Sequence, residues 1–324
     1  MKAAICEKYG PPEVVQIREV PKPAPKDNEL LIRVLATTVS AGDSRVRGLR
    51  VPAGFAFLMR LALGFGGPRQ PVLGTELSGV VEAVGHSVTR FRPGDAVFAF
   101  TDMAMGCHAE YCCVAENATV EPKPENISFE EAAALCFGGT TALFFLQKAH
   151  IKPGETVLIN GASGAVGSAL VQLAKFMGAQ VTAVCGGANA ELVRSLGADA
   201  VINYAQNDFT QNGQTYDAIF DTVGNLSLAR CKQSLKPGGR LALLVAGLGT
   251  MLAAPWQSLI GNKRVVVGTA SGSIENVRLL ATLAKEGKFR PVIGRVVDFE
   301  QIVEAHRYAD GGHKLGNVVV RLPQ

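Results

Sequence analysis

The pattern of hydrophobic and polar positions changes near residue 122. Before that point, short apolar runs bounded by Gly and Pro predict β-strands at 29–35, 77–84 and 96–100, and no helix dominates. After it, Ser128-Phe-Glu-Glu131 has the spacing of a capping box and predicts the start of an Ala-rich helix. A second helix is expected at 141–149. The chain therefore contains two regions that are built from different elements.

From residue 156 onward, strand-like and helix-like segments alternate. The pattern predicts strands at 156–160, 180–185, 200–202, 218–222, 240–245 and 263–269, with helices at 166–178 and 190–196. β-Branched strands that are apolar on both faces are typical of a parallel sheet covered by helices on both sides. The tail is expected to form a helix at 274–286 and strands at 292–297 and 317–322, which fold back on the first region. This pattern predicts an α/β fold with a doubly wound parallel sheet.

Length and composition are consistent with that organisation. The 324 residues suggest two domains, and 48% hydrophobic against 19% charged residues argues for globular folding rather than disorder. The balance of 32 basic and 28 acidic residues gives a net charge of +4. That charge is too small and too evenly spread to predict nucleic acid or an anionic membrane as the main partner. We therefore expect a small-molecule partner.

The cysteines and the apolar segments bear on the compartment. Seven cysteines, an odd number scattered along the chain, argue against a disulfide framework and predict a reducing, cytoplasmic location. The apolar run at 3–6 is too short for a signal peptide. Residues 241–261 carry no charge, but Gly247, Gly249 and Pro255 interrupt them. We interpret the first part of that stretch as a buried strand rather than as a membrane span.

The strongest local motif is Gly161-Ala-Ser-Gly164-Ala-Val-Gly167, which directly follows one predicted strand and directly precedes a helix. Small residues allow a tight turn and a close approach to a pyrophosphate, and the free N–H groups at the helix start attract anionic phosphates. In this context the motif predicts dinucleotide binding. The alternative is a glycine-rich turn that holds no ligand.

The identity of the nucleotide depends on the end of the next strand. NAD sites usually place Asp or Glu there for the ribose hydroxyl, and residues 181–189 contain neither, which permits a 2′-phosphate. They also contain no Arg or Lys, so contacts to that phosphate would come from Asn189, Tyr204 or backbone amides. Gly186 and Gly187 could equally do no more than shape a turn. We therefore predict NADP (NADPH), with NAD possible.

These motifs together resemble the medium-chain dehydrogenase/reductase superfamily, and within it the zinc-independent quinone oxidoreductase branch. The similarity runs from end to end. It rests on Met1-Lys-Ala, Gly10-Pro-Pro, Pro21-Lys-Pro, Gly74-Thr-Glu76, Gly79-Val-Val81, Arg92-Pro-Gly-Asp95, Ala109-Glu-Tyr111, 161–167, Leu196-Gly-Ala-Asp199, Asp221-Thr-Val-Gly224 and Pro237-Gly-Gly239. The resemblance implies a β-rich GroES-like catalytic domain made of 1–122 and 271–324, a Rossmann domain at 123–270, and an active site in the cleft.

The resemblance also implies roles for individual residues of the cofactor site. Thr141 matches a threonine near the nicotinamide, and Val245-Ala246-Gly247 matches the loop beside its carboxamide. The remaining candidates are Ser163, Ala165 and Val166 in the phosphate loop, together with Gly161, Gly164, Gly167, Val223 and Asn317. Asn317 stands where the family often has Lys, which removes one possible phosphate partner.

Zinc enzymes of this superfamily bind the metal through Cys, His and Cys. The matching positions here are Ser40, Thr75 and Phe137, so all three ligands are absent, and Cys136 lies one residue out of register. The cysteines of the structural zinc lobe are absent as well. We interpret His108 as a surface or turn histidine rather than as a ligand, and we predict no metal.

Without a metal, oxidation of an unactivated alcohol lacks a polarised alkoxide, whereas hydride addition to a conjugated carbonyl leaves an enolate that needs only hydrogen bonds and a proton. Ser40 and Thr75 are candidate donors to that oxygen, although both could simply fill the former metal cavity. Arg45 stands where family members often carry Tyr. It could stabilise negative charge or face solvent, and the proton donor stays open.

We therefore predict an NADPH-dependent reductase of quinones or α,β-unsaturated carbonyls that works without zinc. The alternatives are a metal-free alcohol dehydrogenase and a nucleotide-binding structural or regulatory protein without catalysis. The apolar segment 51–65 could be a flap over the substrate cleft, a buried helix or a subunit contact. Residues 264–267 predict an open sheet edge, and so a homodimer.

Overall fold

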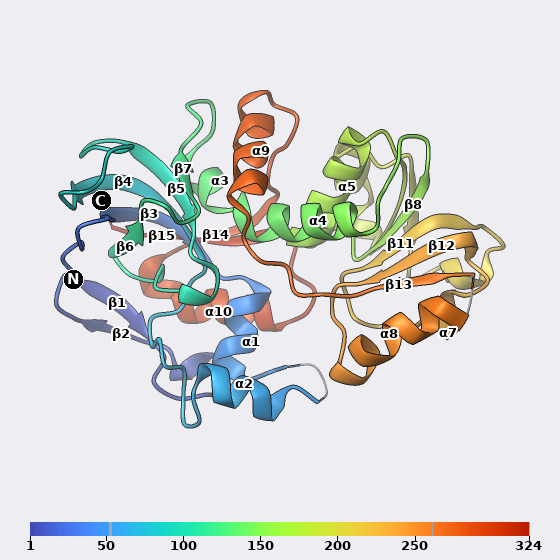
Figure 1. Cartoon of the computed structure of the whole chain (residues 1–324), viewed down its shortest axis with the longest axis horizontal. Helices are drawn as coiled ribbons and strands as arrows, with labels where there is room; N and C mark the ends of the chain where they lie inside the picture. The colour runs from blue at the N-terminus through green and yellow to red at the C-terminus, as the bar shows by residue number, and fades with distance from the viewer. Residues whose placement is uncertain (52–53, 261, 324) are drawn as a thin grey trace. The chain divides into compact units, whose positions relative to one another are not determined.

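The structure is a computed structural model that describes residues 1–51, 54–260 and 262–323, except for the side chains of 257–260. The chain forms two compact units (Figure 1). Unit 1 contains Met1–Val51, Ala56–Thr140 and the chain from Gly272 onward, and unit 2 is essentially Thr141–Ser271. The first boundary therefore lies at 140/141, whereas the sequence pattern predicts 122/123. The second lies one residue beyond the predicted 270/271.

The shift of the first boundary has a clear cause in the packing of residues 128–135. The predicted capping box is present, because Ser128 accepts from the amide of Glu131 and starts helix α3 (Phe129–Ala133). Ala133 and Ala134 are fully buried against Ala36 and Val319. This helix therefore belongs to the hydrophobic core of unit 1, although it follows the last predicted strand of that region.

Unit 1 is built on a seven-stranded sheet of order β14-β15-β3-β4-β5-β7, in which β6 also pairs with β3. A two-stranded sheet, β1-β2, accompanies it. The strands are β1 (Lys2–Ile5), β2 (Gln16–Glu19), β3 (Glu29–Thr38), β4 (Glu76–Val84), β5 (Ala96–Phe100), β6 (Tyr111–Ala115), β7 (Val120–Pro122), β14 (Ile293–Asp298) and β15 (Asn317–Arg321). β15 pairs with β3 in an antiparallel register, so the prediction that the tail folds back on the first region is confirmed.

The helices of unit 1 include α1 (Ala41–Gly48), which the hydrophobic pattern does not predict. They also include α2 (Ala56–Leu63), within the apolar segment 51–65, for which a buried helix is one interpretation; a helix is present there, but most of its residues are exposed. α1 begins at a second capping box, formed by Ser40 and Asp43, and ends at Leu49 in the left-handed conformation with φ 46°. The others are α3, α9 (Ile274–Lys285) and α10 (Ile302–Asp310). Of the predicted apolar segment 51–65, residues 52 and 53 lie outside the described residues.

Helix α4 (Cys136–Lys148) begins earlier than the predicted 141–149 and contains the boundary between the units. Its first turns carry Gly138 and Gly139, which have low helix propensity. The second glycine is required by close packing, because a Cβ there would lie 2.6 Å from a methyl carbon of Leu280 on α9. Tertiary packing therefore outweighs propensity at this point.

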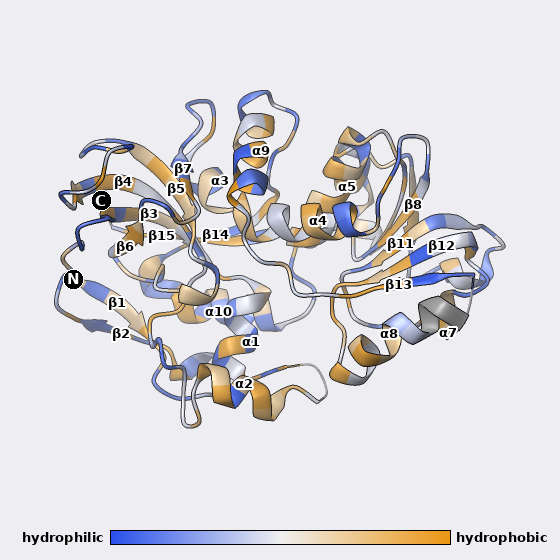
Figure 2. Ribbon diagram, viewed as in Figure 1, coloured by the Kyte–Doolittle hydropathy of each residue, from blue (hydrophilic) through white to orange (hydrophobic). Residues whose placement is uncertain are grey.

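Unit 2 is a doubly wound α/β unit with a six-stranded parallel sheet of order β10-β9-β8-β11-β12-β13, as the fold-class prediction requires. Figure 2 shows the apolar character of these strands. They are β8 (Thr156–Asn160), β9 (Gln180–Cys185), β10 (Ala200–Asn203), β11 (Tyr216–Asp221), β12 (Leu235–Leu243) and β13 (Arg264–Val266). The helices are α5 (Ala165–Phe176), α6 (Ala190–Ser195), α7 (Leu228–Cys231) and α8 (Leu248–Ile260).

The uncharged stretch 241–261 is split between two elements. Its beginning completes the buried strand β12, and its later part forms α8, with Pro255 inside the helix; residue 261 lies outside the described residues. Among the described residues, no helix combines the length and apolar composition needed to cross a membrane. β13 is the edge strand of the sheet, as predicted, although it is only three residues long.

Candidate functional site

The glycine motif forms the connection between β8 and α5. Gly161 has φ +82°, which favours glycine, and a Cβ at Gly167 would lie 2.1 Å from the carbonyl oxygen of Gly161. Gly164 is the N-cap of α5, and a Cβ there would meet only the Gly161 carbonyl oxygen, at 3.6 Å. The turn is therefore tightly packed on the protein side and open at Gly164. Uncapped amides at the start of a twelve-residue helix fit an anionic phosphate group.

Asp221, at the end of β11, organises the neighbouring turn. Its side chain is fully buried, and its Oδ1 accepts from the amides of Val223 and Gly224 and from the Asn160 side chain, at 3.0–3.1 Å. Its Oδ2 accepts from the amide of Leu226 at 2.9 Å. Sequence reasoning used this aspartate only within a family motif. An acidic residue at the end of an apolar strand is the signal that could have identified it.

The predicted nucleotide-specificity residues come together at the ends of β9 and β10. A Cβ at Gly186 would lie 3.4 Å from the Tyr204 hydroxyl oxygen, and a Cβ at Gly187 would lie 2.9 Å from the side-chain nitrogen of Asn203. Tyr204 is 59% exposed. Asn189 precedes α6, and its side chain caps no amide of that helix. The Tyr204 side chain is thus placed beside the glycine turn that follows β9, and Asn189 belongs to that turn.

Most of the other predicted cofactor residues lie at the same edge of the sheet. Ser163, Ala165 and Val166 belong to the β8–α5 turn, Val223 follows β11 and is 54% exposed, and Ala246 and Gly247 follow β12. The strands of this sheet are parallel, so their carboxyl ends share one edge, where ligands bind in open α/β sheets.

Two of the predicted cofactor residues are placed differently. Thr141 lies within α4 at the start of unit 2, away from the strand ends in sequence. Asn317 belongs to unit 1, at the start of β15, where it is buried. Its side-chain amide donates to the carbonyl oxygen of Val292 at 3.0 Å. The Asn317 side chain therefore makes a structural hydrogen bond within unit 1.

In unit 1, Ser40 and Asp43 form a buried hydrogen-bonded pair. The Ser40 hydroxyl donates to Asp43 Oδ2 at 2.6 Å, and the Ser40 amide donates to the same oxygen at 2.7 Å. Asp43 Oδ1 accepts from the Gly74 amide at 3.0 Å, which ties the start of α1 to the loop before β4. The single hydroxyl proton of Ser40 is thus already used, and this serine fits the role of substrate donor less well than Thr75 does.

Thr75 is buried, and its hydroxyl has no hydrogen-bond partner among the described residues. Gly74, with φ +91°, sets the position of this loop, because a Cβ there would lie 2.5 Å from the His108 ring. The Thr75 carbonyl oxygen accepts from the Thr101 amide at 2.8 Å, so the backbone is fixed while the hydroxyl is free. A buried free hydroxyl is costly unless something else binds it.

Glu76 is a fully buried carboxyl next to Thr75. It accepts from the Thr38 hydroxyl at 2.5 Å and from the Phe137 amide at 2.7 Å. Burial raises the pKa of the Glu76 carboxyl to about 7, although both hydrogen bonds oppose that shift. The Glu76 side chain therefore faces inward and connects β3, β4 and α4 within unit 1.

The interpretation of His108 as a surface or turn histidine is wrong. Its side chain is fully buried, and Nε2 donates to the carbonyl oxygen of Thr38 at 2.8 Å. Its ring meets the ring of His306 edge-on, with centroids 5.7 Å apart, and His306 Nδ1 accepts from Arg47. The residues that surround the His108 and His306 rings come from α1, α10 and β3, which are distant in sequence. No local pattern around residue 108 therefore predicts that this histidine is buried.

Unit 1 also contains two half-buried cations. Arg45 on α1 is half-buried, burial lowers the pKa of its guanidinium, and it has no ion-pair partner among the described residues. Lys314 is half-buried, and its ammonium donates to the Gly316 carbonyl oxygen at 3.0 Å. Burial lowers the pKa of Lys314 to about 8, while the carboxyls of Glu76 and Asp43 act in the opposite direction. Sequence reasoning did not identify Lys314, because no motif contains it.

The positions that match zinc ligands contain no metal-binding set. Within 1–51, 54–260 and 262–323, no group of three His, Cys, Asp or Glu side chains is arranged to hold a metal ion. Cys136 is fully buried in the first turn of α4, and burial raises the pKa of its thiol well above the usual value. Its surroundings thus favour the neutral thiol over the thiolate that metals bind.

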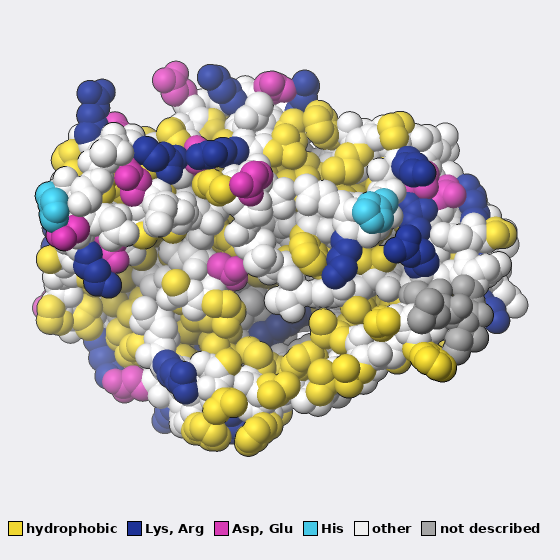
Figure 3. All heavy atoms as spheres, viewed as in Figure 1, with side chains coloured by type: hydrophobic (Ala, Val, Ile, Leu, Met, Phe, Trp, Pro, Cys, Tyr) yellow, Lys and Arg dark blue, Asp and Glu magenta, His cyan; other side chains and the backbone are white. Residues whose placement is uncertain are grey.

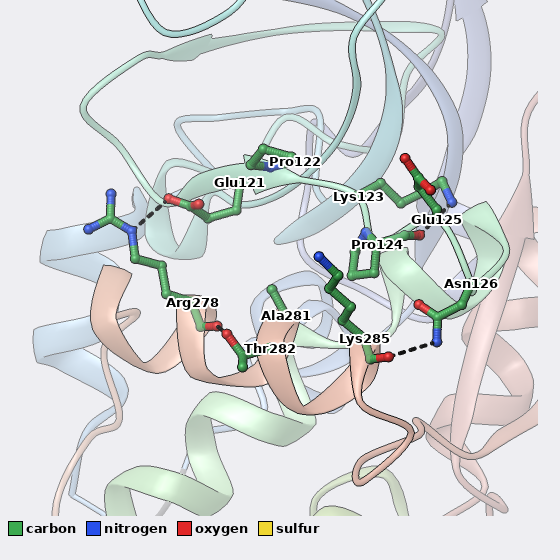
Figure 4. Close-up of a pocket in the computed structure, with 10 residues that line it drawn as sticks. All are labelled: Glu121, Pro122, Lys123, Pro124, Glu125, Asn126, Arg278, Ala281, Thr282 and Lys285. Carbon is green, nitrogen blue, oxygen red and sulfur yellow. Dashed lines mark hydrogen bonds and ion pairs between the residues drawn. The ribbon is translucent and has the colours of Figure 1, made fainter.

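A separate hollow of about 740 Å³ lies between the segment after β7 and helix α9 (Figure 4). Three of its charged groups are already engaged: Arg278 pairs with Glu121 at 3.0 Å, and the Lys123 ammonium donates to two backbone carbonyl oxygens. Its lining residues are Glu121, Pro122, Lys123, Pro124, Glu125, Asn126, Arg278, Ala281, Thr282 and Lys285. None of the predicted site residues is among them.

A doubly wound sheet whose first strand–helix turn is open to an anion defines a dinucleotide-binding protein, here joined to a second, mainly antiparallel unit. The chain matches the family profile described as "Alcohol dehydrogenase GroES-like domain" over residues 26–125 and the one described as "Zinc-binding dehydrogenase" over 196–320. The chain belongs to the medium-chain dehydrogenase/reductase superfamily, in its quinone oxidoreductase-like branch, and is an NAD(P)H-dependent oxidoreductase.

Individual relatives support that assignment over nearly the whole chain. A quinone oxidoreductase of Sus scrofa is 32% identical, over 94% of this chain and 93% of its own. A 2-methylene-furan-3-one reductase of Solanum lycopersicum is 31% identical, over 99% of this chain and 79% of its own. The solved structure of the quinone oxidoreductase from Coxiella burnetii superposes with a TM-score of 0.87 at 29% identity, covering 100% of this chain and 99% of that one.

Proposed function

We propose that the protein is an NADPH-dependent reductase of quinones or α,β-unsaturated carbonyl compounds that works without zinc. The observation that carries this proposal is the buried Thr75 hydroxyl, which lacks a partner and stands where zinc enzymes of the superfamily have a metal ligand. The similarity to a quinone oxidoreductase and to a furanone reductase supports the same substrate class.

Unit 2 would hold the nucleotide. The open amides at Gly164 and the start of α5 would bind the pyrophosphate, and the turn fixed by Asp221 would border it. The bound nicotinamide supplies a hydride. Asn189 and Tyr204 are the side chains proposed to contact a 2′-phosphate, because the end of β9 has no acidic residue that would repel it.

Unit 1 would supply the polar contact to the substrate oxygen. When hydride adds to the far end of a conjugated carbonyl, negative charge develops on the oxygen, and a fixed hydroxyl donor stabilises it. Thr75 meets this requirement because its hydroxyl makes no other bond among the described residues, whereas the Ser40 hydroxyl donates to Asp43. Arg45 would add positive charge, and Lys314 is the proposed proton source.

The side chains at the ligand positions support the proposed zinc independence. One matching profile is described as a zinc-binding dehydrogenase, yet Ser40, Thr75 and Phe137 stand where that chemistry needs Cys, His and Cys. Elemental analysis of protein purified without chelator is expected to find no stoichiometric zinc. About one zinc per chain would overturn this part of the proposal.

The decisive experiment follows NADPH consumption with a quinone, a short 2-alkenal and an apolar enone, alongside NADP with simple alcohols. We expect turnover of conjugated acceptors and none of the alcohols. Activity on alcohols alone would establish the metal-free dehydrogenase instead. Binding of NADPH without turnover of any acceptor would favour a non-catalytic nucleotide-binding protein.

A parallel titration is expected to show tighter binding of NADPH than of NADH, and the reverse order would contradict the NADPH assignment.

A further inference from the structure

Helix α2 and the turn that follows it form an unusually apolar exposed surface on unit 1. Phe57 is 67% exposed, Leu58 48%, Leu61 52% and Phe65 58%; we call these four residues the α2 surface. Figure 2 shows the apolar character of the helix, and Figure 3 shows hydrophobic side chains gathered over it at the lower edge of the view. Contiguous exposed apolar residues of this kind mark an interaction surface.

The helix is nevertheless held to its own unit. Leu63 is buried in the core of unit 1, and Met59 packs against the same core. The Tyr9 hydroxyl donates to the Gly64 carbonyl oxygen at 2.7 Å, just beyond the end of α2. The inward side of α2 is thus anchored by a few contacts, and the α2 surface points away from them.

Positive charge accompanies the apolar residues. Residues 44–75 contain five arginines and neither Asp nor Glu. Arg47 and Arg50 pair with Asp310, but Arg60 and Arg69 are exposed and have no carboxylate partner among the described residues. Both are fixed at the end of α2, since Arg60 donates to the carbonyl oxygen of Phe65 at 2.7 Å and Arg69 to that of Leu61 at 3.0 Å.

We propose that the α2 surface docks on the face of an anionic lipid bilayer. The four apolar side chains would enter the boundary between headgroups and acyl chains, and Arg60 and Arg69 would contact lipid phosphates. A symmetric contact between two copies would instead bring the unpaired arginines together, so charge complementarity favours the lipid. The whole-chain charge of +4 predicts no membrane partner, because it averages over this local patch.

The test is flotation of the full-length protein with vesicles of phosphatidylcholine, with and without phosphatidylglycerol. We expect binding to the anionic vesicles, weaker binding to the neutral ones, and release as salt is raised. The double variant Phe57→Ser/Leu61→Ser should lose at least roughly tenfold in partitioning, because both side chains supply apolar area. Both are exposed, so thermal unfolding should not change. Phe176→Ser, at a 48% exposed site on α5, is the matched control and should bind like the parent.

Failure of the parent protein to float with anionic vesicles would overturn the proposal. Equal binding by the parent and the double variant would do so as well, because the α2 surface would then not be the contact. If the double variant instead changes the oligomeric state in solution while neither protein binds vesicles, the α2 surface is a contact between two copies of the chain.

Discussion

At the scale of single residues, the buried Thr75 hydroxyl lowers the free energy of unfolding, because no described residue forms a hydrogen bond with it. Burying a hydroxyl without a partner costs about 1–3 kcal/mol, so its removal should leave stability unchanged or slightly higher. Thr75→Val keeps the shape of the side chain and removes only the donor. We expect turnover of an enone to fall roughly 10²-fold while the melting temperature is maintained. Thr75→Ser, which retains the hydroxyl, is the control, and undiminished turnover by Thr75→Val would make this residue a cavity filler.

Glu76 should make stability depend on pH. Because burial raises its folded pKa to about 7 from the usual 4.5, the folded protein binds more protons than the unfolded chain between these values, and stability falls as pH rises through that window. Glu76→Gln can still accept from the Phe137 amide while donating to Thr38. We expect it to be more stable than the parent at pH 8, by on the order of 3 kcal/mol, and equal at pH 4, in denaturant titrations.

Asp217 provides a control of opposite sign for the pH dependence. Burial favours its protonated form, but the Lys236 ammonium and the Thr156 amide and hydroxyl outweigh that effect and lower its pKa to about 2. Its stabilising contribution is therefore present above the usual value of 3.8 and is lost as pH falls toward 2. Asp217→Asn should destabilise the protein at neutral pH.

For the Glu76 prediction, a parent protein whose stability does not change between pH 4.5 and 7 would contradict the buried placement of this carboxyl.

Lys314 should determine the alkaline limb of the activity profile. If its ammonium supplies the proton, the rate should fall as pH rises through about 8, the pKa to which burial lowers it. Lys314→Arg keeps the positive charge but does not titrate in that range. We expect the variant to be slower and to lose the decline near pH 8 in profiles of kcat/KM. An unchanged profile would point to solvent as the proton source.

At the scale of elements, the β8–α5 turn offers a substitution that should weaken nucleotide binding without changing the stability of the protein. Gly164 has φ −76°, which any residue can adopt, and a Cβ there would meet no protein atom closer than 3.6 Å. Gly164→Ala should therefore fold normally but weaken NADPH binding, since the methyl group would occupy the space proposed for the pyrophosphate. Fluorescence titration and thermal unfolding measure both quantities. Gly249→Ala, where a Cβ would meet no atom within 4 Å, is the control, and equal affinities in the two variants would contradict the placement of the phosphate at this turn.

The elements that the sequence predicts well are those whose periodicity and local capping agree. The strands 156–160, 180–185 and 96–100 are found with the predicted bounds, and Ser128 starts a helix as predicted. α1 is only eight residues long, too short to establish a periodic pattern. α2, of the same length, lies where a buried helix is one interpretation, but Phe57, Leu58 and Leu61 on it are exposed. The start of α4 is not predicted because its glycines have low helix propensity, and Gly139 is there for packing against Leu280.

The candidate site divides in the same way. The glycine turn is local in sequence, so its geometry could be predicted from spacing alone. The surroundings of Thr75 could not, because they depend on burial produced by distant segments: His108, Glu76 and Lys314 acquire their environments from strands and helices far away in sequence. Ser40 illustrates the difference, since its proton is used by a helix cap that the motif comparison does not reveal.

At the scale of the whole molecule, the open edge of the unit 2 sheet predicts a homodimer. β13 pairs only with β12 in the described sheet, which leaves its other side without a strand. Light scattering at micromolar concentration should give twice the chain mass of 34.1 kDa. A monomer at that concentration would contradict this prediction.

The path of the chain through unit 1 also sets an order for its biosynthesis. Unit 2 is essentially one continuous segment, 141–271, and can complete its sheet soon after that segment leaves the ribosome. Unit 1 cannot, because β15, which lies between β14 and β3, is the last strand to be made. Residues 29–33 of β3 pair with β6 much earlier, so it is the β3 segment 36–38 that stays unpaired on this edge until β15 is made. The nascent chain would therefore present a folded nucleotide-binding unit together with an incomplete sheet, which makes residues 36–38 the expected site of chaperone capture or aggregation during synthesis.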